Sequence, residues 1–174
     1  ISKELLKDAK NLLSKNQKIL CMINFKEINS LDDLIDIVKD KKNLIYGVRF
    51  AVDPLNIENY SKLLNKFKKQ FPEINIFTNI MYANNWFKDD KRITFMIKKC
   101  KNFSSYISFV DSYGAFEMQD TISFFKKIKK KFPEINSGCH FHNNCGLALA
   151  NTLSALESGC SVADTIHLKR RLFA

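Results

Sequence analysis

The sequence has little glycine and no long apolar run. Only five of its 174 residues are glycines, and they form neither a Gly-x-Gly-x-x-Gly pattern nor another phosphate-binding loop. Its longest apolar segments are too short to cross a bilayer, and nothing resembles a secretory signal. These absences argue against a dinucleotide-binding fold, a membrane protein and a secreted protein.

Cysteine usage gives no sign of a disulfide framework. The five cysteines are an odd number, and most of them lie in apolar segments typical of strands or helices. Free thiols are the rule in reducing compartments. We therefore expect a reduced, cytoplasmic protein.

The chain carries a formal net charge of +10, yet arginine is scarce. The arginines are Arg49, Arg92, Arg170 and Arg171. All other basic residues are lysines, which fall at predicted helix ends and outer faces. No nucleic-acid-binding motif accompanies them, and a coding bias towards AT-rich codons explains a chain rich in Lys, Asn and Ile. Nucleic acid is therefore not the expected partner, although a lysine-rich nucleic-acid binder stays open as an alternative.

Helical and strand-like segments alternate along the chain. The predicted strands are 18–24, 44–51, 74–81, 106–111, a segment ending at His142, and 162–166. The predicted helices are 2–15, 31–39, one opened by Asp53 and Pro54, 93–100, 119–131 and an alanine-rich helix after residue 146. The motif Phe-Pro-Glu-Ile-Asn occurs at 71–75 and again at 132–136, each time between a lysine-rich helix end and a strand. We expect one domain, 1–174, of repeated βα units.

Polar residues gather near the carboxyl ends of the predicted strands. They are Asn24, Arg49, Asn79, Asp111, Ser112, His140, His142 and Asp164. This is where (β/α)₈ barrels keep their chemistry, whereas a doubly wound sheet would need a glycine-rich loop. The predicted fold is therefore an α/β protein, a partial (β/α)₈ TIM barrel of about six βα units.

His140 and His142 are the most informative pair. Residues at i and i+2 of a strand point to the same face, so the two imidazoles are predicted to lie side by side and could hold one metal ion. Cys139 falls on the opposite face, which argues against a zinc site that uses its thiolate.

These histidines lie in a longer pattern, His140-Phe-His-Asn-Asn-x-Gly-Leu-Ala-Leu-Ala-Asn151, followed by Ala155-Leu-Glu-x-Gly159. The pattern resembles the sixth-strand signature of the HMG-CoA lyase-like superfamily of metal-dependent barrels, the DRE-TIM metallolyases. That superfamily includes 4-hydroxy-2-oxovalerate aldolases, isopropylmalate synthases and the carboxyltransferase domain of pyruvate carboxylase. Val110-Asp-Ser-Tyr-Gly-Ala115 resembles the fifth-strand segment of its aldolase branch, and Val48-Arg-Phe-Ala51 fits the third strand.

The resemblance implies a register. The six strands would be the second to the seventh of the barrel, so the first strand, with its arginine–aspartate pair, and the last strand would be missing. We therefore expect a fragment, incomplete at both ends, that is inactive in isolation. Its two open sheet edges would favour association.

The resemblance also implies roles for individual residues. His140 and His142 would be ligands of Mn²⁺ or Mg²⁺, with Zn²⁺ possible, and His140 would also lie against the substrate. Ser112 would contact the substrate, and Asp111 and Arg49 would line its pocket. From the residues alone, Asp111 could equally cap a turn, and Arg49 could form a salt bridge. The catalytic base is not assigned, and His167 receives no role.

The implied activity is a divalent-metal-dependent aldolase, a C–C lyase acting on a pyruvate-type 2-oxo acid and an aldehyde. Two alternatives stay open, namely a Claisen-type acyltransferase related to isopropylmalate synthase and a decayed, non-catalytic barrel fragment. A homo-oligomer or a partner enzyme is expected for the full-length protein.

Overall fold

A computed structural model of the chain describes residues 2–164 and contains one sheet of six parallel strands in the order β1 to β6. The strands are β1 (Leu20–Ile23), β2 (Gly47–Val52), β3 (Asn75–Ile80), β4 (Tyr106–Asp111), β5 (Ser137–Phe141) and β6 (Val162–Ala163). The α-helices are α1 (Lys3–Leu12), α2 (Leu31–Val38), α3 (Ile57–Gln70), α4 (Asp90–Cys100), α5 (Met118–Lys131) and α6 (Ala148–Glu157). Short 3₁₀ turns are η1 (Phe25–Glu27), η2 (Pro54–Asn56) and η3 (Ala83–Asn85).

The predicted alternation of strands and helices is confirmed, with shifts at the boundaries. β4 has the predicted bounds, whereas β2 begins three residues later than predicted, at Gly47. The last predicted strand, 162–166, is reduced to Val162–Ala163 among the described residues. Asp164 follows the strand, and the last two predicted positions, Thr165 and Ile166, lie outside the part of the chain that the structure describes, as does His167.

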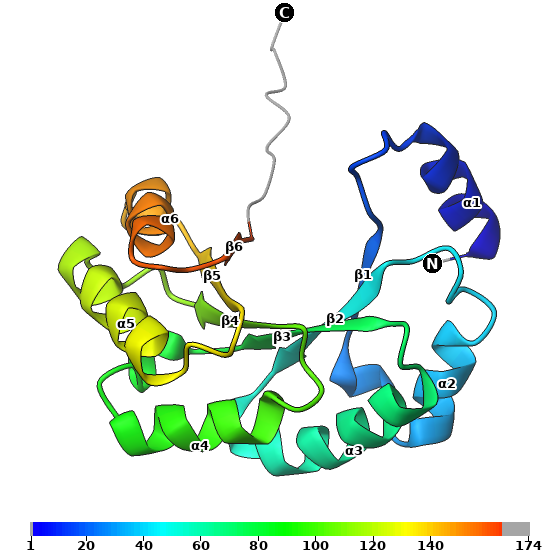
Figure 1. Cartoon of the computed structure of the whole chain (residues 1–174), viewed down its shortest axis with the longest axis horizontal. Coiled ribbons are helices and arrows are strands. Elements are labelled where there is room, and N and C mark those ends of the chain that lie inside the picture. Colours follow the sequence, from blue (N-terminus) through cyan, green and yellow to red (C-terminus); the bar gives the residue numbers. More distant parts are fainter. Residues whose placement is uncertain (1, 165–174) are drawn as a thin grey trace, which may run out of the picture.

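The sheet is curved, and helices α2 to α6 lie along one side of it (Figure 1). Helix α1 lies beyond β1, at one end of the sheet. No helix of residues 2–164 covers the opposite, inner side (Figure 1). Within the same range, no helix has the length and apolar character needed to span a membrane.

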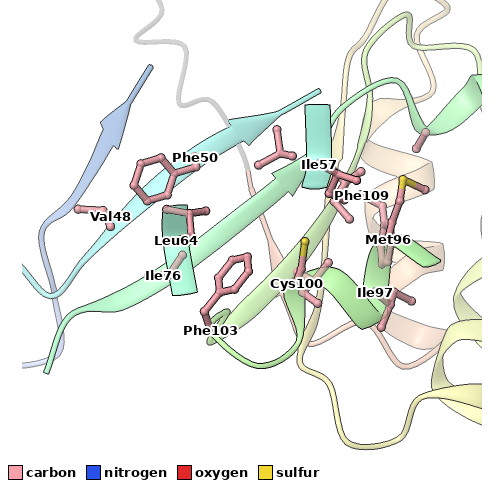
Figure 2. Close-up of a cluster of buried hydrophobic side chains, with 14 of the residues drawn as sticks. Val48, Phe50, Ile57, Leu64, Ile76, Met96, Ile97, Cys100, Phe103 and Phe109 are labelled. Atoms are coloured by element: carbon pink, nitrogen blue, oxygen red, sulfur yellow. The ribbon is translucent and has the colours of Figure 1, made fainter. Parts of the chain in front are cut away.

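The two faces of the strands differ in chemistry because successive side chains alternate. On β2, Val48, Phe50 and Val52 are buried against the helices, whereas Arg49 faces the inner side. Figure 2 shows the outer layer, in which strand side chains meet residues of α3 and α4. The labelled residues there are Val48, Phe50, Ile57, Leu64, Ile76, Met96, Ile97, Cys100, Phe103 and Phe109. The core therefore lies between sheet and helices, and the inner side is free to carry polar groups.

The repeated Phe-Pro-Glu-Ile-Asn motif forms the same local structure twice. Phe71 and Phe132 are buried at the ends of α3 and α5, where each backbone N–H donates to a carbonyl oxygen in the last turn of its helix. Asn75 donates its side-chain amide to the Tyr46 carbonyl oxygen at 3.1 Å, and Asn136 does the same to Ser105 at 3.2 Å. Each copy of the repeat thus ends one helix. Its asparagine then bonds to the residue that precedes the adjacent strand, β2 for Asn75 and β4 for Asn136.

Asp111 organises the turn that follows β4. Its side chain is 1% exposed, and its two carboxylate oxygens accept hydrogen bonds from the backbone N–H groups of Ala115 (3.1 Å) and Phe116 (2.9 Å). Of the two roles considered for Asp111, the structure thus shows the capping of a turn. These bonds occupy two of the roughly four acceptor positions of the carboxylate.

Gly138 sets the approach of β5 to β4. A Cβ atom at this position would clash with Ser108 Oγ and would lie 3.0 Å from Ser108 Cβ. Gly138→Ala should therefore lower the free energy of unfolding by about 2 kcal/mol, the usual range for overpacking. Urea denaturation of this variant, of Ser108→Gly and of the double variant measures the effect. The double variant lacks the Ser108 Oγ and Cβ atoms that the added Cβ would meet, so Gly138→Ala should cost less stability there. If Gly138→Ala lowers the free energy of unfolding equally with and without the Ser108 side chain, this account is contradicted.

Asp111→Asn should lower the free energy of unfolding by about 2 kcal/mol, because one backbone N–H would then face an amide NH₂ instead of a charged acceptor. Thermal and urea unfolding measure the loss. The matched control is Asp36→Asn, which removes an exposed carboxylate that pairs with Lys39, and its stability should stay unchanged. Equal stability of the two variants would show that the Asp111 cap contributes nothing.

Candidate active site on the inner side of the sheet

His140 and His142 lie at the carboxyl end of β5, as the alternation of the strand predicts. Their ring centroids are 5.1 Å apart and the ring planes are nearly perpendicular, at 81°. Both side chains are half-buried. Cys139, the residue of β5 before His140, is buried in the core on the other face. The two imidazoles therefore share one small region of the inner side.

His142 is oriented by a backbone contact. Its Nδ1 lies 2.9 Å from the carbonyl oxygen of Ser112. A carbonyl oxygen only accepts, so Nδ1 carries the proton and, in the neutral ring, Nε2 keeps its lone pair. Metal-binding histidines are commonly oriented by such a second contact. Gly114 permits it, since a Cβ there would lie 2.7 Å from the His142 carbonyl oxygen.

His140 has a different environment. Its Nδ1 is buried and has no hydrogen-bond partner among the described residues. Burial lowers the pKa of His140 below its usual value, and the charges of His142 and Arg49 act in the same direction, while nearby Asp164 opposes the shift. At neutral pH the ring is therefore uncharged, which is the form that binds metal ions.

Arg49, Asn79 and Asp164 form a network across the inner side. One oxygen of the Asp164 carboxylate accepts from Arg49 Nη2 at 2.7 Å, and the other accepts from Asn79 Nδ2 at 3.0 Å. The network joins β2 and β3 to the end of β6. Arg49 Nε and Asn79 Oδ1 are buried and keep no partner within residues 2–164.

The position of Arg49 corrects one expectation. The sequence places Arg49 near the carboxyl end of its strand, whereas it is the third residue of β2, which continues to Val52. The salt bridge considered as an alternative for Arg49 is present, with the buried Asp164 as its partner. The side chain nevertheless reaches the inner side, where it meets the polar network.

Ser112 connects the histidines to the loop after β3. Its Oγ accepts a hydrogen bond from the backbone N–H of Tyr82 at 2.9 Å, while its carbonyl oxygen receives His142. Within residues 2–164, the hydroxyl proton of Ser112 meets no acceptor. Ser112 therefore holds the loops together and could also donate to a ligand.

The candidate metal ligands fit a divalent ion only in part. The ring of His142 is oriented by its Nδ1 contact with the Ser112 carbonyl oxygen, which leaves Nε2 for a metal ion. The ring of His140 has an unpartnered Nδ1 within residues 2–164. Among residues 2–164, however, no third His, Cys, Asp or Glu joins them in a group that could hold a metal ion. Mn²⁺ and Mg²⁺ take about six donors, so these two imidazoles amount to part of a ligand set.

Two members of the site were not predicted as such. Asn79 and Asp164 were noted as polar strand-end residues, but nothing in the sequence pairs either with Arg49. Asn79 and Asp164 are 85 residues apart, so the sequence gives no sign of the hydrogen bond between them. The strand alternation alone could have placed Asn79 on the inner side.

Comparison with known proteins finds a family match in the second half of the chain. Residues 87–166 match the HMGL-like family. A 4-hydroxy-2-oxovalerate aldolase from Thermus thermophilus is 42% identical over 55 residues, which are 32% of this chain and 16% of the aldolase. A homocitrate synthase from Sulfolobus acidocaldarius is 36% identical over 59 residues, 34% of this chain and 13% of the synthase. Each match thus covers only a small part of the curated relative.

Solved structures support the fold over nearly the whole chain. The N-terminal domain of a proposed aldolase from Bacteroides vulgatus superposes with a TM-score of 0.82 at 24% identity, over 94% of this chain and 52% of that chain. The carboxyl transferase domain of Rhizobium etli pyruvate carboxylase, in a structure with pyruvate, gives 0.74 at 18% identity over 94% and 29%. The chain spans about half the length of the first of these structures.

These matches confirm the resemblance seen in the sequence and include both its aldolase and its synthase relatives. The fold is an α/β partial TIM barrel, and residues 87–166 match the HMGL-like family.

Proposed function

We propose that this chain is part of a divalent-metal-dependent C–C lyase that acts on a small 2-oxo acid. The observation that carries the proposal is a group of three buried polar atoms without partners on the inner side, namely Arg49 Nε, Asn79 Oδ1 and His140 Nδ1. Buried polar atoms are normally hydrogen-bonded. Three such atoms, one of them on the imidazole of His140 itself, indicate a site built to receive a small polar ligand.

The residues suggest how a 2-oxo acid would be held. The Arg49 Nε–H can donate to a carboxylate oxygen, and the Ser112 hydroxyl can donate to a second oxygen of the ligand. Asn79 Oδ1 can accept only from a donor, such as the hydroxyl of a 4-hydroxy-2-oxo acid. The orientation of the Asn79 amide follows from its bond to Asp164, because only the NH₂ group can donate to a carboxylate.

His140 and His142 would supply protein ligands to Mn²⁺ or Mg²⁺, with Zn²⁺ also compatible with imidazole. A bound divalent ion supplies Lewis-acid stabilisation of the enolate that forms when a C–C bond breaks or is made. The histidines contribute neutral nitrogens at fixed positions, His142 through its contact with Ser112 and His140 through burial. The partial ligand set also supports the expectation that the isolated chain turns over no substrate.

A second candidate is a Claisen-type acyl transfer, favoured by the homocitrate synthase relatives. Both reactions pass through an enolate and need the same metal and oxygen contacts. Aldol cleavage is the first choice because Val110-Asp-Ser-Tyr-Gly-Ala115 resembles the aldolase branch. Release of an aldehyde or dependence on an acyl-CoA, measured on the full-length protein, would distinguish the two.

The metal can be tested directly. In titrations of Mn²⁺ followed by electron paramagnetic resonance, His140→Ala and His142→Ala should each weaken binding by at least about tenfold, because each removes one nitrogen ligand. Asn144→Ala, an exposed change two residues from His142, is the matched control and should bind as the unmodified chain does. Unchanged Mn²⁺ binding in both histidine variants would rule out this site.

The substrate class can be tested by the same titration. Pyruvate should tighten Mn²⁺ binding, since its keto and carboxylate oxygens would add two ligands, whereas acetate should have a much smaller effect. Arg49→Gln should reduce the pyruvate effect by about tenfold, the loss of a charge-assisted hydrogen bond, and leave Mn²⁺ binding without pyruvate intact. No enhancement by pyruvate would contradict a 2-oxo-acid site.

A further inference from the structure

A cavity lies at the carboxyl end of the sheet, and its lining residues are separate from the polar network on the inner side. Its volume is about 280 Å³. It is formed by the loops after β2, β3 and β4 and by the first turn of α4. The residues that matter for its chemistry are Asp53, Leu55, Tyr82, Trp86, Arg92 and Tyr113.

The backbone at Tyr82 is held in a left-handed conformation. With φ 60° and ψ 37°, Tyr82 is the one non-glycine residue of the described chain with a positive φ. A bulky residue there carries a conformational cost of about 1 kcal/mol or more, and such residues concentrate at functional sites. The hydrogen bond from the Tyr82 N–H to Ser112 Oγ holds it in place. In this conformation Tyr82 lines the cavity.

Two aromatic rings meet at this cavity. The ring centroids of Tyr82 and Tyr113 are 5.9 Å apart with an interplanar angle of 31°. Both side chains remain exposed, at 37% and 51%, although aromatic rings of this size usually gain from burial. The exposed side chain of Leu55 adds apolar surface at the same place. The cavity therefore offers a surface for a planar, apolar group.

The cavity also contains a cation without a counter-ion. Arg92 is half-buried, and its guanidinium forms no salt bridge with a carboxylate of residues 2–164. The other charged residue at the cavity is Asp53, and one of its carboxylate oxygens already accepts from the Leu55 N–H at 2.9 Å. Arg92 is thus the group best able to bind a ligand, and a planar guanidinium matches a carboxylate.

From these features we propose that the cavity binds a small carboxylate with an aromatic body, its ring against Tyr82 and Tyr113 and its carboxylate on Arg92. The volume lies just below the usual range for drug-sized ligands, in agreement with an acid of one ring. This site is separate from the proposed 2-oxo-acid site and does not depend on it. The two are connected through Ser112, which contacts both Tyr82 and His142.

The chain contains its own reporter for this site. Trp86 is the single tryptophan of the sequence and lines the cavity. Titration of the 174-residue chain with 3-phenylpropionate should give a saturable change in tryptophan fluorescence. The neutral analogue 3-phenylpropan-1-ol should bind at least about tenfold more weakly, because it lacks the carboxylate.

Variants test each contact separately. Arg92→Gln should weaken 3-phenylpropionate binding by at least about tenfold, whereas Lys98→Gln, the matched removal of an exposed charge from the same helix, should leave it unchanged. Tyr82→Gly should weaken binding severalfold without lowering stability, because glycine adopts the left-handed backbone freely.

His140→Ala, which removes the proposed metal ligand that is not bonded to Ser112, should bind the acid as the unmodified chain does, so loss of the proposed metal site and loss of this one are distinguishable. The proposal is wrong if no saturable change occurs, if the alcohol binds as well as the acid, or if Arg92→Gln and Lys98→Gln behave alike.

Discussion

The alternation of side chains along parallel strands is the constraint on which this structure depends. Because neighbouring residues face opposite sides, a strand such as β2 buries Val48 and Phe50 against helices while it presents Arg49 to the inner side. The same rule places Cys139 in the core and His140 beside His142. One geometric period thus separates a hydrophobic layer from a polar one without any additional domain.

The polar layer is stabilised by contacts among its own members. Asp164 is buried and would be costly to keep charged alone, so it depends on Arg49 and Asn79. A buried ion pair of this kind adds little net stability. Removal of one partner lowers stability more than replacement of the whole pair, because it leaves a buried charge unpaired. We regard its value as positional, since it fixes the direction in which Arg49 Nε and Asn79 Oδ1 point.

Much of the fold could be predicted from the sequence, because its signals are local. β4 was predicted with its observed bounds, and the repeated Phe-Pro-Glu-Ile-Asn marks two helix ends correctly. The predicted start of β2 is wrong, because Leu44, Ile45 and Tyr46 are apolar yet precede the strand. The partners of Arg49 and the left-handed backbone of Tyr82 were missed, since the first depends on distant strands and the second on a tertiary hydrogen bond.

The strand order also has a consequence for the way the chain folds. Each strand pairs in parallel with the one before it in sequence, so every strand pairing must close one whole βα unit, as Leu20 with Gly47 does, and such non-local pairing is slow. The network of Asp164 with Arg49 and Asn79 is the exception, since it joins residues 115 and 85 positions apart. It can form only after the intervening strands are in place. The polar side is thus assembled last, and formation of this ion pair would mark the end of folding.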